Sequence, residues 1–254
     1  MDKKQSSDAS LLAKICALEL NPCAPVSAVG GGLSLFHAAC CAGRVDLVAG
    51  LLAPPHKVDP NCAAFVGGLS LGGVPVGAGE GRCCWSSGQV LGIELAIVAN
   101  HSEVCSILLD AEALVGRGVH LAIAFGSSES LRIILDRASE SVRARLATYC
   151  VDGVPPIVVA ALSNSGKALE MLLEAKADPL QRLQEQGTKL LSVRPVDLHN
   201  IVGDENNSAL VVAQRMGVAG LSILRELIDN VVQRRMLGSL SILPHGPKSA
   251  AGAW

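Results

Sequence analysis

The sequence predicts an all-α fold made of stacked pairs of short helices, which is a helical-repeat solenoid. Two observations lead to this prediction. One skeleton of small and apolar residues recurs along the 254-residue chain, and the chain contains only two Trp, one Tyr and three Phe. The core must therefore consist of Ala, Leu, Val and Ile, whose small side chains let helices approach closely and suit thin stacked helices better than broad sheets.

Each unit of the skeleton begins at an alanine in a predicted first helix. A Gly or Asn follows four residues later, and two adjacent apolar residues follow after twelve and thirteen. This spacing predicts two antiparallel helices joined by a turn in which Gly or Asn adopts the left-handed conformation. A fifth unit around Ala213 fits less well, because its apolar pair comes two positions late. The four units that fit without a gap begin at Ala39, Ala96, Ala122 and Ala160.

The units do not fill the chain evenly, so we expect three segments and two insertions. Residues 1–30 are expected to supply an N-terminal capping helix and a lead-in, residues 31–230 about five repeats, and residues 231–254 a C-terminal tail. The insertions are placed at 62–88 and 180–206. The first repeats the pentapeptide GGLSL of residues 31–35 at 67–71 but carries eight glycines, and at about 1 kcal/mol lost per Gly it cannot hold two helices.

Several of the units resemble ankyrin repeats. That family opens its first helix with Thr-Pro-Leu-His-x-Ala, and degraded forms stand at 34–39, 118–122 and 155–160. Turn sequences of the family's Ala-Asp-x-Asn type stand at 58–61 and 177–179. The starting alanines are 57, 26, 38 and 53 residues apart, where the family repeats about every 33 residues. The resemblance therefore implies an eroded array with loop insertions and short β-turns.

The resemblance also implies roles for particular residues. His37 and His120 stand at the signature histidine position, which implies buried hydrogen bonds between repeats. The binding surface of the family lies at the turn tips and late in each first helix. Since most side chains there are apolar, we expect them to be covered either by the chain's own insertions or by a protein partner. Carried onto this chain, those positions are Cys41, Ala42, Val98, Ala99, Ala124, Phe125, Leu162, Ser163, Arg215 and Met216.

Phe65 and Trp85 flank the glycine-rich insertion and are candidates for interface anchors, because aromatic side chains bury a large area with few rotatable bonds. The alternative hypothesis is that they hold the insertion against the helix stack.

Charge and hydropathy narrow the classes of partner. A net charge of -2, from 21 basic and 23 acidic residues, gives no field that would gather nucleic acid or an anionic membrane. No apolar run reaches the roughly 18 residues of a membrane-spanning helix, and the N-terminus lacks a secretory signal. We therefore expect a cytoplasmic protein without a cofactor. The mean hydropathy of +0.41 favours a stable subunit of a larger protein assembly.

A zinc-binding or thiol-redox role is the first alternative function. Nine cysteines are most simply reduced thiols that act as small apolar residues. Thiolate and imidazole ligands would suit zinc, although adjacent cysteines rarely direct both sulfurs at one metal. Redox sensing is suggested for Cys83 and Cys84, which lie beside Arg82. The candidate residues are Cys40, Cys41, His56, Cys62, Cys83 and Cys84.

A serine hydrolase is the second, more remote alternative. Residues 68–72 read G-x-S-x-G around Ser70, which is the spacing of a nucleophile elbow. An elbow needs a strand before the serine and a helix after it. Residues 66–69 make a poor strand, and residues 72–75 contain two glycines and a proline. We therefore expect no catalytic residues and no enzyme activity.

Overall fold

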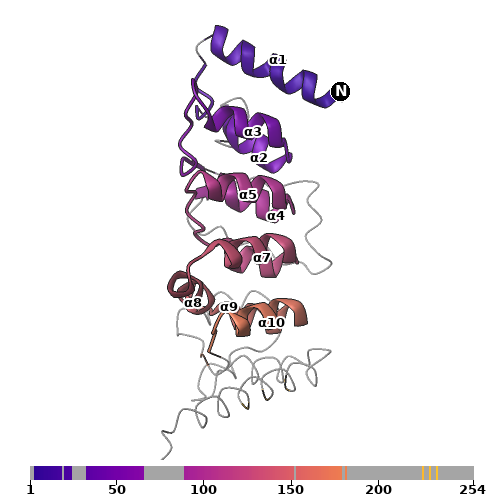
Figure 1. The fold of residues 1–254 in the computed structure, drawn as a ribbon, viewed down its shortest axis with the longest axis vertical. Helices are drawn as coiled ribbons and strands as arrows, with labels where there is room; N and C mark the ends of the chain where they lie inside the picture. Colours follow the sequence, from indigo (N-terminus) through magenta and orange to yellow (C-terminus); the bar gives the residue numbers. More distant parts are fainter. Residues whose placement is uncertain are drawn as a thin grey trace, which may run out of the picture.

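The computed structural model describes residues 3–18, 20–24, 33–65, 89–151 and 153–178, together with the single positions 181, 225, 229 and 233. Its helices form one elongated stack, and α1 lies at one end (Figure 1). Four helix pairs make up the stack, as the four alanine skeletons predict. The pairs are α2 (Leu35–Cys41) with α3 (Val45–Leu52), α4 (Gly92–Val98) with α5 (Ser102–Asp110), α6 (Gly118–Ala124) with α7 (Ser128–Arg137), and α9 (Pro156–Leu162) with α10 (Gly166–Glu174).

The pairs stack in two layers. The first helices pack in the order α2, α4, α6, α9, and the second helices in the order α3, α5, α7, α10. The skeleton residues fill the space between the layers, because the four starting alanines and the first member of each apolar pair are buried. The chain therefore forms the all-α, ankyrin-like repeat solenoid that the sequence predicts. These first members are Leu51, Leu108, Ile134 and Leu172.

The turns inside the pairs have the predicted left-handed conformation. Their φ angles lie between 52° and 69°. In each turn the following residue donates its backbone N–H to the carbonyl of the starting alanine over 2.8–3.0 Å. This bond ends the first helix in a Schellman-type turn and satisfies a carbonyl that would otherwise lack a partner. The left-handed residues are Gly43, Asn100, Gly126 and Asn164.

The turns that leave the pairs are built by Asp and Asn side chains. Asp59 accepts the backbone N–H of Asn61 on Oδ1 over 2.8 Å, and Asn61 accepts the N–H of Leu114 on its own Oδ1 over 2.7 Å. Asn61 thus links the exit turn of the first pair to that of the second. At the second predicted turn, Gln181 donates its N–H to the carbonyl of Asp178 over 3.1 Å.

The start of the fourth pair follows from its prolines. Helix α9 begins at Pro156, where the missing N–H has no intrahelical partner to lose. An isolated antiparallel bridge between Val151 and Val154 precedes it.

Two helices and two short strands of the described part lie outside the four pairs. Helix α1 (Lys3–Ala17) packs against α3. Helix α8 (Glu140–Thr148) lies in the sequence between the third and fourth pairs, and it accounts for the large number of residues between their starting alanines. The short strands β1 (Ala63–Phe65) and β2 (Gln89–Leu91) pair antiparallel. Neither α8 nor the strands were predicted, and β1 lies inside the predicted insertion 62–88. Phe65 pairs with Gln89.

Among the helices of the described part, none is long and apolar enough to cross a membrane.

Several predictions fall outside the described residues. The predictions that lie outside are most of both insertions, most of the fifth unit around Ala213, nearly all of the C-terminal tail, and residues Ser70, Cys83, Cys84, Trp85, Arg215 and Met216.

Candidate functional site

The described part of the predicted binding surface lies at the C-terminal ends of the four first helices. Each helix contributes its last residue and the residue that caps it. Since these helices pack directly on one another, their ends form one continuous row. We call it the first-helix row, and it consists of Cys41, Ala42, Val98, Ala99, Ala124, Phe125, Leu162 and Ser163.

The first-helix row is only partly exposed. Val98 is 7% exposed and belongs to the core. Cys41, Ala99, Phe125 and Leu162 are half-buried. The larger side chains pack inward, as Leu162 does against the main core. The row therefore presents small side chains with partly accessible larger ones between them, and its exposed members are Ala42, Ala124 and Ser163.

Hydrogen bonds from two of the turns join the first three helices of the row. His101 donates Nε2–H to the carbonyl of Cys41 over 3.1 Å. Ser127 donates its hydroxyl to the carbonyl of Ile97 over 2.7 Å. Both donors stand five residues after a starting alanine, and both reach back to the end of the preceding first helix. Sequence reasoning missed this set, although a polar residue recurs at the same offset in all four units.

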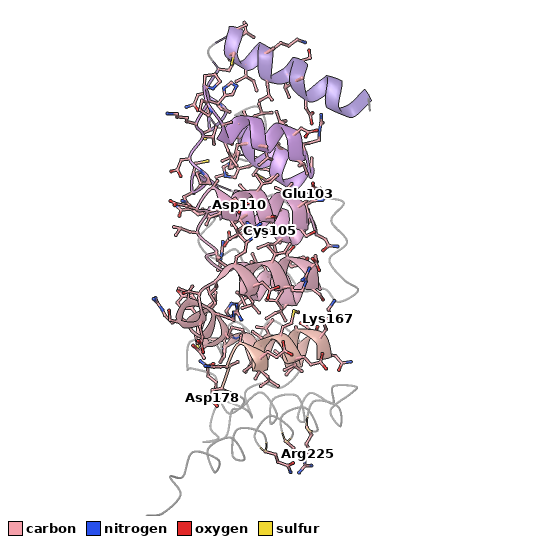
Figure 2. The ribbon with its side chains drawn as sticks, viewed as in Figure 1. Glu103, Cys105, Asp110, Lys167, Asp178 and Arg225 are labelled. Carbon is pink, nitrogen blue, oxygen red and sulfur yellow. The ribbon has the colours of Figure 1, made fainter. Side chains whose placement is uncertain are left out.

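Charged residues border the row at the start of each second helix. Glu103 and Lys167 lie on one side of the stack, whereas Asp110 and Asp178 lie on the other (Figure 2). The first turns of α3, α5 and α7 each carry one acidic residue, which is favourable near a helix N-terminus. We give the name charged rim to the exposed charged residues in the first turns of the four second helices. They are Asp46, Glu103, Glu129 and Lys167.

Both signature histidines are buried and hydrogen-bonded, as predicted. His37 donates Nε2–H to the carbonyl of Cys62 over 3.1 Å, and its Nδ1 lies 2.7 Å from the hydroxyl of Ser34. His120 donates Nε2–H to the carbonyl of Val154 over 2.8 Å. Burial lowers the pKa of His37, and the bond to the Cys62 carbonyl offsets part of this shift. The two side chains thus bind the N-terminal parts of α2 and α6 to the segments that follow.

The second pair carries a carboxylate at the histidine position. Glu94 forms two parallel bonds of 3.0 Å with Arg117, which stands at the N-terminus of α6. Arg117 also donates to the carbonyl of Gln89 in β2 over 2.8 Å. The Glu94 side chain is 3% exposed and that of Arg117 is 24% exposed. Sequence reasoning missed this pair, whose signal was a single charge inside the apolar run GIELAIV.

A cavity of about 400 Å³ opens beside this ion pair. Glu94 and Arg117 form one wall, and Tyr149, Cys150 and Val151 form another. The Glu94 carboxylate already accepts bonds from the Arg117 side chain and from the N–H of Leu91 in β2. The charged wall is thus engaged in holding the second pair to the third.

The described part of the predicted zinc group does not form a metal site by itself. Cys40 is fully buried in the main core, and Cys41 packs against a smaller apolar cluster. His56 contacts a thiol of α1, and Cys62 contacts a thiol of the lead-in. No three His, Cys, Asp or Glu side chains gather in metal-binding geometry among the described residues. Burial raises the pKa of both Cys40 and Cys41, which keeps these thiols protonated.

Comparison with known proteins adds one structural similarity. The crystal structure of the human ASB11 ankyrin repeat domain is similar with a TM-score of 0.46 and 15% sequence identity, over 88% of this chain and 98% of that chain. No protein-family model and no curated protein matches the sequence. The helix pairs, their left-handed turns and the hydrogen bonds between them, and not this similarity, define the chain as an ankyrin-like helical-repeat solenoid.

Proposed function

We propose that the chain is a non-catalytic protein–protein interaction module and serves as a structural subunit of a larger assembly. The observation that supports this most directly is the first-helix row, which continues across four stacked helices, the first three of which are joined by hydrogen bonds from the turns. A surface that is already rigid loses little conformational entropy when a partner binds, so more of the contact energy is available as affinity.

The side chains of the row suggest how a partner would be held. The exposed Ala42, Ala124 and Ser163 leave room for the partner's side chains, while the half-buried Phe125 and Leu162 offer apolar contact area. Apolar contacts at the centre with charges at the edge are the usual anatomy of protein interfaces. Phe65, whose backbone lies in β1, and Trp85 remain proposed additional anchors.

The charged rim suggests which partner surface is favoured. Asp46, Glu103 and Glu129 place an acidic residue beside each of the first three pairs, whereas Lys167 stands at the fourth. Part of this charge is balanced internally, because Arg132 donates Nε–H to Glu129 over 3.1 Å. We propose a partner that presents basic residues along the first two pairs, since opposite charges at the rim speed and orient association.

Affinity capture from the native cells tests this proposal. Tagged wild type is compared with Ala124→Arg, which puts a long cation into the middle of the row, and with Ala49→Arg, which makes the same change at an exposed site on α3. Circular dichroism checks that both variants are folded. We expect wild type and Ala49→Arg to recover the same stoichiometric partner and Ala124→Arg to recover at least tenfold less. Equal recovery by all three, or a wild-type particle near 26.2 kDa, would contradict the proposal.

A further inference from the structure

Two thiols from distant parts of the sequence touch at the junction between the N-terminal segment and the first helix pair. The sulfur of Cys23 lies 3.2 Å from the sulfur of Cys62, and 39 positions separate the residues. Both are free cysteines with half-buried side chains. Since a disulfide bond measures about 2.05 Å, an approach of about 1 Å would allow the sulfurs to bond.

The backbone on both sides of this contact is held in place. Cys23 donates its N–H to Oδ1 of Asn21 over 2.9 Å. Cys62 donates its N–H to the carbonyl of Asp59 over 3.1 Å, and its carbonyl accepts Nε2–H of His37 over 3.1 Å. The proximity of the sulfurs is thus set by two turns and a buried histidine.

A second contact crosses the same junction. The Cys16 sulfur, at the end of α1, lies 3.4 Å from Nε2 of His56. Cys40, in contrast, is completely buried. A soluble oxidant therefore reaches Cys23 and Cys62 more readily than Cys40.

We propose that Cys23 and Cys62 are a redox-responsive pair that forms a reversible disulfide by exchange with a small-molecule disulfide of the oxidised glutathione type. The Cys23 thiolate attacks one sulfur of that disulfide and releases one glutathione thiol. The Cys62 sulfur, after losing its proton to water, then attacks the sulfur of Cys23 and releases the second thiol. Two protein thiols are oxidised and one glutathione disulfide is reduced to two thiols, so atoms and electrons balance.

The surroundings of Cys62 favour this order of events. The pKa of Cys62 is raised to about 12, most strongly by burial and further by the hydrogen bond to the Cys23 thiol and by the charges of Cys23 and Asp59. Once Cys23 is in the mixed disulfide, it can no longer ionise, so both contributions from Cys23 disappear. Cys62 then ionises more easily, and the second step can follow.

The disulfide would fasten the capping helix to the stack. Helix α1 is otherwise held by packing on α3 and by the ion pair between Asp8 and Arg44. A covalent link between Cys23 and Cys62 restricts the unfolded chain and therefore stabilises the native state. Oxidation is thus expected to make the end of the solenoid more resistant to unfolding.

Peptide mapping of the full-length protein tests the inference. Trypsin cuts after Lys14, Arg44, Lys57 and Arg82, so Cys62 is the single cysteine of peptide 58–82, while Cys23 lies in peptide 15–44. The protein is incubated with oxidised glutathione, its remaining thiols are blocked, and the digest is analysed by mass spectrometry. Cys23→Ser and Cys62→Ser remove the pair, and Cys16→Ser, in the same peptide as Cys23, is the matched control.

We expect peptides 15–44 and 58–82 to be linked in oxidised wild type and in Cys16→Ser, and unlinked in Cys23→Ser and after reduction. The thermal midpoint of wild type should rise by several degrees on oxidation and return on reduction. A link that persists in Cys23→Ser, a link from 58–82 to the peptide that starts at Cys83, or glutathione attached to Cys23 and Cys62 without a link would overturn the inference.

Discussion

Glu94 and Arg117 join the second helix pair to the third through two parallel hydrogen bonds of 3.0 Å. The first and third pairs place a histidine at the position of Glu94, and its ring N–H bonds to a backbone carbonyl of the next segment. The second pair uses a carboxylate that requires a cation from the following helix. Burying either charge alone would cost several kcal/mol, so the two residues act as one unit.

Removal of the cation alone is therefore predicted to be more harmful than removal of both charges. Arg117→Met leaves the Glu94 carboxylate buried without its partner, and we expect a loss of about 3 kcal/mol in the free energy of unfolding. The double variant Glu94→Leu/Arg117→Met should lose less than Arg117→Met alone. Urea unfolding measures these two losses and that of the single variant Glu94→Leu. A double variant that loses the sum of the two single losses would show that the residues are not coupled.

The left-handed turns allow a matched pair of glycine substitutions. Gly43 has a φ of +65°, and an added Cβ would lie 2.6 Å from the His101 ring; Gly126 has a φ of +69° with no neighbour within 4 Å of that position. Gly126→Ala should lose about 1 kcal/mol from the left-handed backbone alone. Gly43→Ala should lose at least about 1 kcal/mol more, because His101 must move away from the Cys41 carbonyl. Equal losses in urea unfolding would refute this role of His101.

The buried His37 predicts a pH dependence with a definite sign. Because its pKa is lowered in the fold, the native state binds fewer protons than the unfolded state once the pH falls below about 6.5. The contribution of His37 to stability is therefore complete above that pH and is lost as the pH falls from about 6.5 through its folded pKa. Unfolding free energies of wild type and His37→Gln should converge between about pH 7.5 and pH 5. A difference that stays constant over this range would mean that His37 does not titrate on unfolding.

The capping helix provides a local prediction. Asp8 is 3% exposed and accepts Nε–H of Arg44 over 3.2 Å. Asp8→Ala removes a charged hydrogen bond worth about 2 kcal/mol, so the backbone amides of α1 should exchange with deuterium at least tenfold faster. Helix α10, at the far end of the described stack, is the internal reference and should be unchanged. Equal acceleration in α1 and α10 would indicate global unfolding and contradict a local role.

Much of the fold was predictable because each helix pair packs in the same way. An alanine where two helices touch, a residue that tolerates positive φ four positions later, and an apolar pair further on are all dictated by a helix hairpin. These positions identified all four described pairs, and the histidine position identified His37 and His120 as buried. Pro156 marked the start of α9 for the same kind of local reason.

The remaining features depend on contacts that no periodic pattern reveals. Helix α8 buries only Ala147 completely, so its sequence carries little amphipathic signal. Glu94 and Arg117 come from different helix pairs and are 23 positions apart. The contact between Cys23 and Cys62 depends on how the lead-in folds over the first exit turn. The residues of the first-helix row lie at the ends of the first helices, but the burial of Val98 depends on tertiary packing.

Site-specific photo-crosslinking in the native cells tests the proposed binding face most directly. A photoreactive amino acid is placed at position 124 in the row or at position 49 on α3, both exposed in the structure. We predict that irradiation links position 124 to one protein in high yield and that position 49 gives no such product. A product at position 49 and none at position 124 would contradict the assignment of the first-helix row as the partner-binding surface.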